Sequence, residues 1–160
     1  MRTAQATPTA EPPTLSSVGD QSVESSKESA TPGTDVLTVP VTAQAVALLR
    51  RRARVASRRW ALSEDVEDAL CVVVTELVTN VLLHSGSARV TLRLAVGHRG
   101  VTVVVEDSGR WRSRLGVRRA VADAGAPCGR GLPLVRAHTR ALRVLRSPHG
   151  TRVHARIPTS

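Results

Sequence analysis

The segment Leu70–His84, with the sequence LCVVVTELVTNVLLH, decides the fold because it is the most apolar stretch of the chain and has helical spacing. On a helical wheel of about 100° per residue, its large apolar side chains form one stripe around Val73. Glu76, Asn80 and His84 follow one another at intervals of four and lie at about −60°, −20° and +20° from Val73. A carboxylate, an amide and an imidazole therefore enter the face that this helix is expected to bury.

This polar column has two explanations. Burying a polar group without a partner costs several kcal/mol, so the column is either a satisfied core network or part of a ligand site. A single buried histidine or asparagine is ordinary, whereas several such groups in one column are typical of functional clefts. We therefore favour a site on the buried face of the helix.

The sequence before and within this segment predicts two long helices. Residues 42–60 have apolar side chains at intervals of three and four, which is the spacing of a half-buried helix. The second helix is expected over residues 63–84. Ser63 is a favourable N-cap, and Glu64 and Asp65 follow it in the first turn, where the helix dipole favours acids.

The remaining patterns predict strands and one short helix. Alternating residues over 88–96 and 101–107, joined by a glycine-bounded turn, predict a hairpin. Further strands are expected at 36–39, 142–146 and 151–157, and a short helix from 129–132 to about residue 138. The layout predicts an α+β fold, a two-layer α/β sandwich whose mostly antiparallel sheet is covered by helices on one face.

Two strands carry a polar residue at the end of an apolar face. Asp107 follows Val101, Val103 and Val105 on the inward face of its strand, and Thr151 begins the inward face of the last strand. An apolar pocket with a few polar groups at its edge is what a small-molecule site requires. Asp107 and Thr151 therefore join Glu76 and Asn80 as candidate site residues.

Gly129, Arg130, Gly131 and Leu132 open the short predicted helix. Free N–H groups at such a start can bind an anion, and glycine allows a close backbone approach. This signal is weak by itself. The chain contains neither the GxxxxGK[ST] pattern of a P-loop nor a GxGxxG pattern that follows a strand, so neither of those nucleotide sites is expected.

The charges divide the chain at about residue 35. Residues 1–35 contain two basic and five acidic residues and few large apolar ones, which predicts a disordered N-terminal tail. Residues 36–160 contain 21 basic and 8 acidic residues and are expected to form one domain. Nucleic-acid binding is disfavoured, because the arginines are scattered and only Trp60 and Trp111 could stack on bases.

The cysteines and the N-terminus exclude further classes. Cys71 and Cys128 are 57 positions apart without a CxxC or a neighbouring histidine, so no zinc site is expected, and Cys71 is predicted to be a buried thiol. The chain shows neither a signal peptide nor an apolar stretch long enough to span a membrane, and a cytoplasmic location without membrane partners is expected.

In this order, the motifs resemble the ATPase superfamily of gyrase, histidine kinases and MutL, and most closely its small anti-sigma-factor serine/threonine kinase branch. Glu76–Asn80 followed by His84 resembles the Asn box, and Glu106–Gly109 the first glycine box. Gly129–Val135 resembles the second glycine box, and Gly150-Thr151 the closing motif. The resemblance covers residues 36–160 and implies an ATP–Mg²⁺ site between helices and sheet, under a lid loop.

The resemblance also implies a role for each matched residue. Glu76 would be the catalytic base and Asn80 a magnesium ligand. Asp107 would accept the adenine amino group, with Thr151 assisting and Gly109 letting the base approach. The second glycine box would shape the lid end against the phosphates, through Gly129, Arg130, Gly131 and Leu132. In one departure from the family, Arg110-Trp111-Arg112 stands where a second glycine is usual.

The expected function is that of an ATP-dependent protein serine/threonine kinase. The resemblance implies transfer of the ATP γ-phosphate to a small partner similar to an anti-sigma antagonist, and it extends to sequestering a sigma factor and to a homodimer. The alternative is a non-catalytic switch that binds a protein partner in response to ATP.

Overall fold

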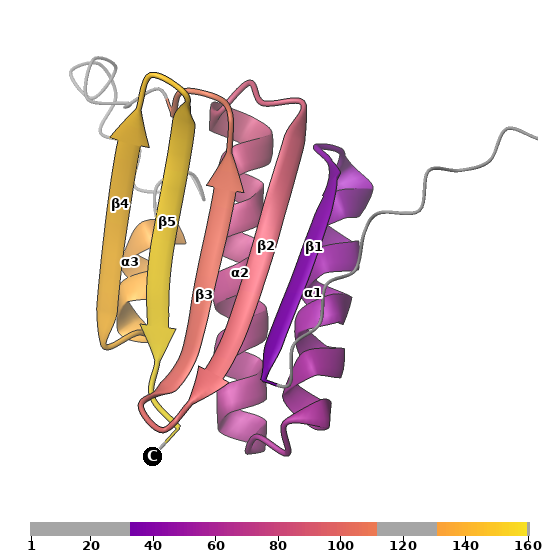
Figure 1. The fold of residues 1–160 in the computed structure, drawn as a ribbon, viewed down its shortest axis with the longest axis vertical. Helices are drawn as coiled ribbons and strands as arrows, with labels where there is room; N and C mark the ends of the chain where they lie inside the picture. The colour runs from indigo at the N-terminus through magenta and orange to yellow at the C-terminus, as the bar shows by residue number, and fades with distance from the viewer. Residues whose placement is uncertain (1–32, 112–130, 160) are drawn as a thin grey trace, which may run out of the picture.

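A five-stranded antiparallel sheet forms one layer of the computed structural model, which describes residues 33–111 and 131–159 (Figure 1). The strand order is β1-β2-β3-β5-β4, and every neighbouring pair is antiparallel. The strands are β1 (Thr34–Pro40), β2 (Arg89–Gly97), β3 (Gly100–Asp107), β4 (Ala141–Ser147) and β5 (Gly150–Ile157).

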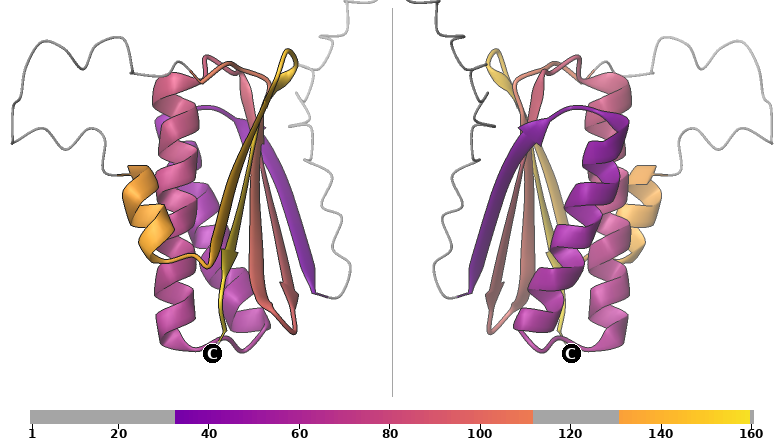
Figure 2. Two further views of the ribbon diagram at one scale, coloured as in Figure 1. Left: turned by 90° about the vertical axis from the view of Figure 1, so that its left-hand side faces the viewer. Right: turned by 90° about the vertical axis from the view of Figure 1, so that its right-hand side faces the viewer.

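Three helices in the described part of the chain form the second layer, and all of them cover the same face of the sheet (Figure 2). They are α1 (Ala43–Arg59), α2 (Glu64–His84) and α3 (Gly131–Ala137). The predicted α+β sandwich is therefore confirmed. No helix that the structure describes is long and apolar enough to cross a membrane.

The helix starts follow the predicted signals. Thr42 caps α1, because its Oγ1 accepts a hydrogen bond from the backbone N–H of Ala45 at 3.3 Å. Ser63 occupies the N-cap position of α2 in an extended conformation, although its side chain makes no capping hydrogen bond. The acidic first turn that follows Ser63 offers the favourable interaction with the helix dipole instead.

The core lies between α1, α2 and the inward face of the sheet. Nine residues of α2 are buried, and they belong to one cluster with the inward residues of β2, β3 and β5, except for Cys71. The register places Leu92, Val105 and Val153 side by side across the three central strands. Helix α2 therefore packs against the middle of the sheet.

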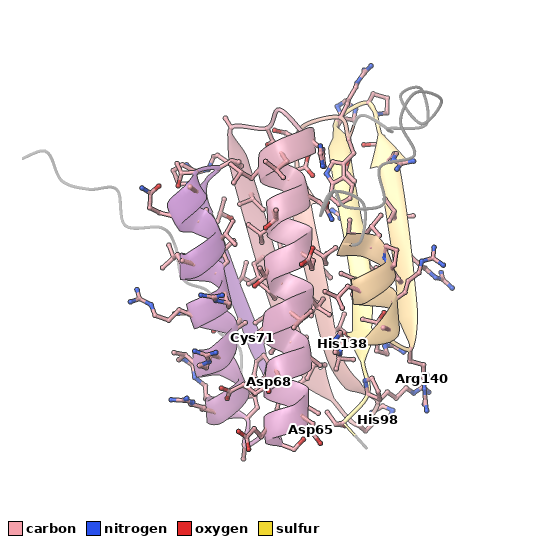
Figure 3. All side chains as sticks on the ribbon, turned by 180° about the vertical axis from the view of Figure 1, so that it is seen from behind. Asp65, Asp68, Cys71, His98, His138 and Arg140 are labelled. Carbon is pink, nitrogen blue, oxygen red and sulfur yellow. The ribbon has the colours of Figure 1, made fainter. Side chains whose placement is uncertain are left out.

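Cys71 is a buried free thiol, as predicted. Burial raises its pKa above the usual value, while Arg54 acts in the opposite direction. Figure 3 looks onto the helical layer and shows Asp65, Asp68 and Cys71 along α2, with His138 beside this helix. Cys128 lies outside the described residues.

No helix that the structure describes covers the outward face of the sheet, and this face is rich in arginine. Glu106 pairs on this face with Arg93 at 3.5 Å and with Arg152 at 3.0 Å, and so links β2, β3 and β5. All of the arginines on this face are exposed: Arg89, Arg93, Arg143, Arg152 and Arg156.

The structure corrects the predicted boundary at residue 35. Strand β1 begins at Thr34, and the Asp35 side chain points into the protein and is 2% exposed. Its Oδ1 accepts a hydrogen bond from Arg52 Nε of α1 at 2.8 Å, and Arg59 lies 3.8 Å from its other oxygen. Asp35 was counted in the tail because it lacks an apolar side chain, but this ion pair makes it part of the domain. Residues 1–32 lie outside the described residues.

We expect Arg52→Ala to destabilise the protein, because it leaves the Asp35 carboxylate in the core without its closest cation. Removing one partner of a buried pair costs about 3–5 kcal/mol, and the lower end applies here because Arg59 remains nearby. The free energy of unfolding can be measured with urea. Arg51→Ala is the control, since Arg51 is an exposed neighbour. Equal stability of the two variants would show that the pair contributes nothing.

Candidate functional site

The polar column of α2 meets the first residue of α3. A Cβ atom built on Gly131 would lie 2.7 Å from Glu76 Oε2 and 3.6 Å from Asn80 Nδ2. A side chain at this position would therefore displace the Glu76 carboxylate. The fold brings together three candidate residues that are up to 55 positions apart in the sequence, and the absence of a side chain at Gly131 allows the contact.

Asn80 provides an unsatisfied polar group at this meeting point. Its Nδ2 atom is buried and has no hydrogen-bond partner among the residues that the structure describes. A buried amide donor without a partner is costly, and native proteins retain few such groups without a functional reason. Within the residues that the structure describes, Asn80 is therefore not part of a fully satisfied core network.

Asp107 ends β3 and lies opposite Thr151 in the pairing of β3 with β5. Its Oδ1 accepts a hydrogen bond at 2.8 Å from the Gly109 N–H, and its Oδ2 accepts one at 2.7 Å from Trp111 Nε1. Thr151 is buried, and its Oγ1 lies 3.5 Å from the Gly109 carbonyl oxygen. The predicted pair of Asp107 and Thr151 is thus adjacent at one end of the sheet.

Burial raises the pKa of Asp107 above its usual value, because desolvation penalises the charged carboxylate. The hydrogen bonds from Trp111, Gly109 and Ser85 act in the opposite direction without cancelling this effect. The folded protein consequently holds this proton at a higher pH than the unfolded chain does. The contribution of Asp107 to stability therefore falls as the pH rises above about 4.

Glycines allow the backbone at this end of the sheet to pack closely. A Cβ atom on Gly109 would lie 2.1 Å from the Ser85 carbonyl oxygen, just after the end of α2. A Cβ atom on Gly150, which has a φ of +142°, would lie 1.9 Å from the Asp107 carbonyl oxygen. The Arg110 N–H donates to the same Ser85 oxygen at 3.0 Å. These contacts fix the backbone on both sides of Asp107.

Two hollows adjoin Thr151, and one of them also adjoins Asp107. One has a volume of about 350 Å³ and is lined by both residues together with the turn between β4 and β5. The other, of about 440 Å³, is lined by Thr151, Arg110, Trp111 and the same turn. Each is roomy enough for a small ligand of the size expected at such a site.

The remaining candidates are placed as follows. Leu132 is partly buried and packs against the core, and His84 lies in the last turn of α2. Gly129 and Arg130 lie outside the described residues. Sequence reasoning missed the contacts that Ser85 and Trp111 make with the Gly109 turn and with Asp107. The one sequence signal for these contacts was Trp111 itself, which stands where the family pattern usually has a second glycine.

The donor set fits magnesium in its chemistry. Asn80 supplies an amide oxygen and Glu76 a carboxylate, and magnesium prefers oxygen ligands. Within residues 33–111 and 131–159, no three His, Cys, Asp or Glu side chains cluster as a metal site. One or two protein oxygens are what a magnesium ion carried by nucleotide phosphates needs, with water completing its coordination.

We expect Gly109→Ala to destabilise the protein by about 1–3 kcal/mol, because its Cβ atom collides with rigid backbone at Ser85. Gly97→Ala is the matched control, because neither glycine has a positive φ and nothing lies within 4 Å of a Cβ on Gly97. Thermal and urea unfolding measure both changes. A Gly109→Ala protein as stable as Gly97→Ala would contradict the close packing at Ser85.

The chain was compared with known proteins. A search of curated protein sequences gave no match. One similar structure contains the RsbU and RsbW domains of Rv1364c from Mycobacterium tuberculosis, with a TM-score of 0.56 and 18% identity over 77% of this chain and 32% of that chain. This chain thus corresponds to about a third of that one, and at this identity the likeness shows the fold alone.

A second similar structure is the histidine kinase domain of the blue-light activated histidine kinase from Erythrobacter litoralis EL346. It has a TM-score of 0.47 and 24% identity over 82% of this chain and 66% of that chain. The family model described as the histidine kinase-like ATPase domain matches residues 39–157, which is most of the sequence. The chain therefore belongs to the histidine kinase-like ATPase domain family, which implies that it binds ATP.

Proposed function

We propose that this protein is an ATP-dependent serine/threonine kinase that regulates a small partner protein similar to an anti-sigma antagonist, and that it also sequesters a sigma factor. The observation that supports this proposal is the position of Glu76 and Asn80, which both lie within 4 Å of the Cβ position of Gly131, together with the Asn80 amide nitrogen that has no partner among the described residues. A carboxylate and an amide side chain thus lie close to each other where α2 meets α3.

The adenine base is recognised at Asp107 in this proposal. The exocyclic amine of adenine donates to the Asp107 carboxylate, and the hydroxyl of Thr151 assists from the neighbouring strand. The buried position of both residues supports this assignment, because a hydrogen bond discriminates between ligands most strongly where water is excluded.

The phosphates are bound near Asn80, whose amide oxygen would hold Mg²⁺. The ion would supply charge neutralisation for the phosphoryl oxygens. Glu76 takes the proton from a serine or threonine hydroxyl of the partner as the hydroxyl oxygen bonds to the γ-phosphorus. The bond between this phosphorus and the β–γ bridging oxygen breaks, and ADP leaves with the electron pair.

One observation favours the alternative of an ATP-responsive switch without phosphotransfer. Glu76 Oε2 is so close to Gly131 that the carboxylate has a packing role at the start of α3. In such a switch, Glu76 couples the position of α3 to the nucleotide, and the partner recognises this position. The two functions differ in whether the partner becomes phosphorylated.

We expect ATP to bind more tightly than GTP, because guanine places a carbonyl oxygen opposite the Asp107 carboxylate and two acceptors repel each other. Asp107→Ala should weaken ATP binding about tenfold or more, the worth of a hydrogen bond to a charged group. Asp68→Asn is the control, since this exposed acid lies in the first half of α2 and lines neither hollow. Calorimetric titration measures these affinities, and equal affinity of the parent protein for ATP and GTP would contradict the assignment.

The same assignment predicts a dependence of base selectivity on pH. Because burial raises the pKa of Asp107, acidification protonates this carboxyl at a higher pH than an exposed aspartic acid. A protonated carboxyl can donate to the guanine carbonyl oxygen. The preference for ATP over GTP should therefore narrow as the pH falls, which repeated titrations would detect.

We expect Glu76→Gln to bind ATP and to lose phosphotransfer by a factor of about 10²–10⁴, because glutamine keeps the size of the side chain and removes the base. Asn80→Ala should instead weaken magnesium-dependent ATP binding. Transfer of radiolabelled phosphate to candidate partners measures the first effect and nucleotide titration the second. Glu64→Gln, in the exposed first turn of α2, is the control.

The outcomes separate the two functions. A Glu76→Gln protein that transfers phosphate at the parental rate would show that the base is another residue. A parent protein that binds ATP but phosphorylates no partner favours the switch and leaves Glu76 its packing role.

A further inference from the structure

Trp111 occupies the position at which the proposed function places the adenine amine. Its indole Nε1 donates to Asp107 Oδ2 at 2.7 Å, while the other carboxylate oxygen accepts from the Gly109 N–H at 2.8 Å. The indole of Trp111 and the adenine base are both flat aromatic ring systems with an N–H donor at the edge. The side chain of Trp111 thus presents to Asp107 the same chemical group that adenine would present.

The surroundings of Asp107 leave little room for two such donors. Asp107 is only 9% exposed, and Trp111 is partly buried and packs against the hydrophobic core. The indole N–H already occupies Oδ2 at 2.7 Å, and the Gly109 N–H occupies Oδ1. An adenine amine that approaches Oδ2 therefore competes with the indole for this partly enclosed oxygen.

The backbone next to Asp107 is fixed, so the movement that opens the site is limited to the Trp111 side chain. Gly109 is packed against Ser85, and the Arg110 N–H donates to the Ser85 carbonyl oxygen at 3.0 Å. The chain is therefore anchored up to the residue before Trp111. Beside the indole lies the hollow of about 440 Å³ that Trp111 lines together with Thr151 and Pro148. Rotation of the side chain into this space uncovers Asp107 without moving β3.

We propose that Trp111 is an internal competitor for the adenine site, which holds Asp107 in a self-satisfied state and lowers the affinity for ATP. This inference rests on the proposed function, because it takes Asp107 as the acceptor for the base. ATP binding exchanges the indole N–H for the adenine amine, one donor for another. The affinity for ATP thus depends on the strength of the hydrogen bond between Trp111 and Asp107.

Two single-tryptophan variants test this competition. Trp111→Phe keeps an aromatic ring and removes the N–H donor, and we expect it to bind ATP about tenfold or more tightly, as loss of a competing hydrogen bond to a charged group predicts. Trp60→Phe is the matched control, because Trp60 lies at the end of α1, and this variant should bind ATP as the parent does. Calorimetric titration with ATP and magnesium measures the affinities.

Fluorescence gives a second readout that does not depend on the stability of Trp111→Phe. Trp111 is the only tryptophan left in the Trp60→Phe chain. Saturating ATP should shift its emission, because the indole leaves the buried carboxylate. In the double variant Trp60→Phe/Asp107→Ala, ATP should shift the Trp111 emission far less. The indole then has no carboxylate partner that it could give up to the adenine amine.

Each outcome decides the inference. A tighter Trp111→Phe variant together with an ATP-dependent emission shift supports competition. Unchanged affinity with unchanged emission overturns it and leaves the proposed function intact. Weaker binding by Trp111→Phe also overturns it, because the indole then belongs to the nucleotide site as a stacking surface. Failure of the parent and of both variants to bind ATP refutes the proposed function, and the inference falls with it.

Discussion

The burial of α2 against the middle of the sheet is the constraint on which the candidate site depends. Leu70, Leu77 and Val81 are fully buried in the core, and burial of each such side chain contributes about 1.5–3 kcal/mol. This apolar stripe determines how α2 is rotated about its axis. The rotation, in turn, places Glu76 and Asn80 at the edge of the core, where α3 begins. The packing that stabilises the fold therefore also orients the polar groups.

Much of the fold could be predicted because its signals are local. The acidic helix start after Ser63 and the glycine-bounded turn of the hairpin are both readable from a few neighbouring residues, and both are confirmed. The family could be recognised for a similar reason, since its motifs keep their order along the chain. The specific residue roles stay predictions, because they depend on a nucleotide and a partner.

Two of the features that sequence reasoning missed are contacts between distant segments. Asp35 follows a segment whose composition is typical of a disordered tail. Only its hydrogen bond with Arg52 of α1 shows that it belongs to the domain. The packing of Gly109 against Ser85 depends on where α2 ends relative to β3, which no local pattern specifies. Trp111 shows that a departure from a family pattern can mark an interaction that belongs to this chain in particular.

The uncovered face of the sheet affects how copies of the protein meet one another. A sheet with helices on one side only offers a broad flat surface, and two such surfaces can stack as in a β-sandwich. Here the exposed guanidinium groups carry the same charge on every copy, and Glu106 neutralises only a part of it. Face-to-face stacking would bring these groups together out of water, which opposes it strongly. The arginines that give the chain its high isoelectric point thus disfavour face-to-face stacking of two copies on the side that no described helix covers.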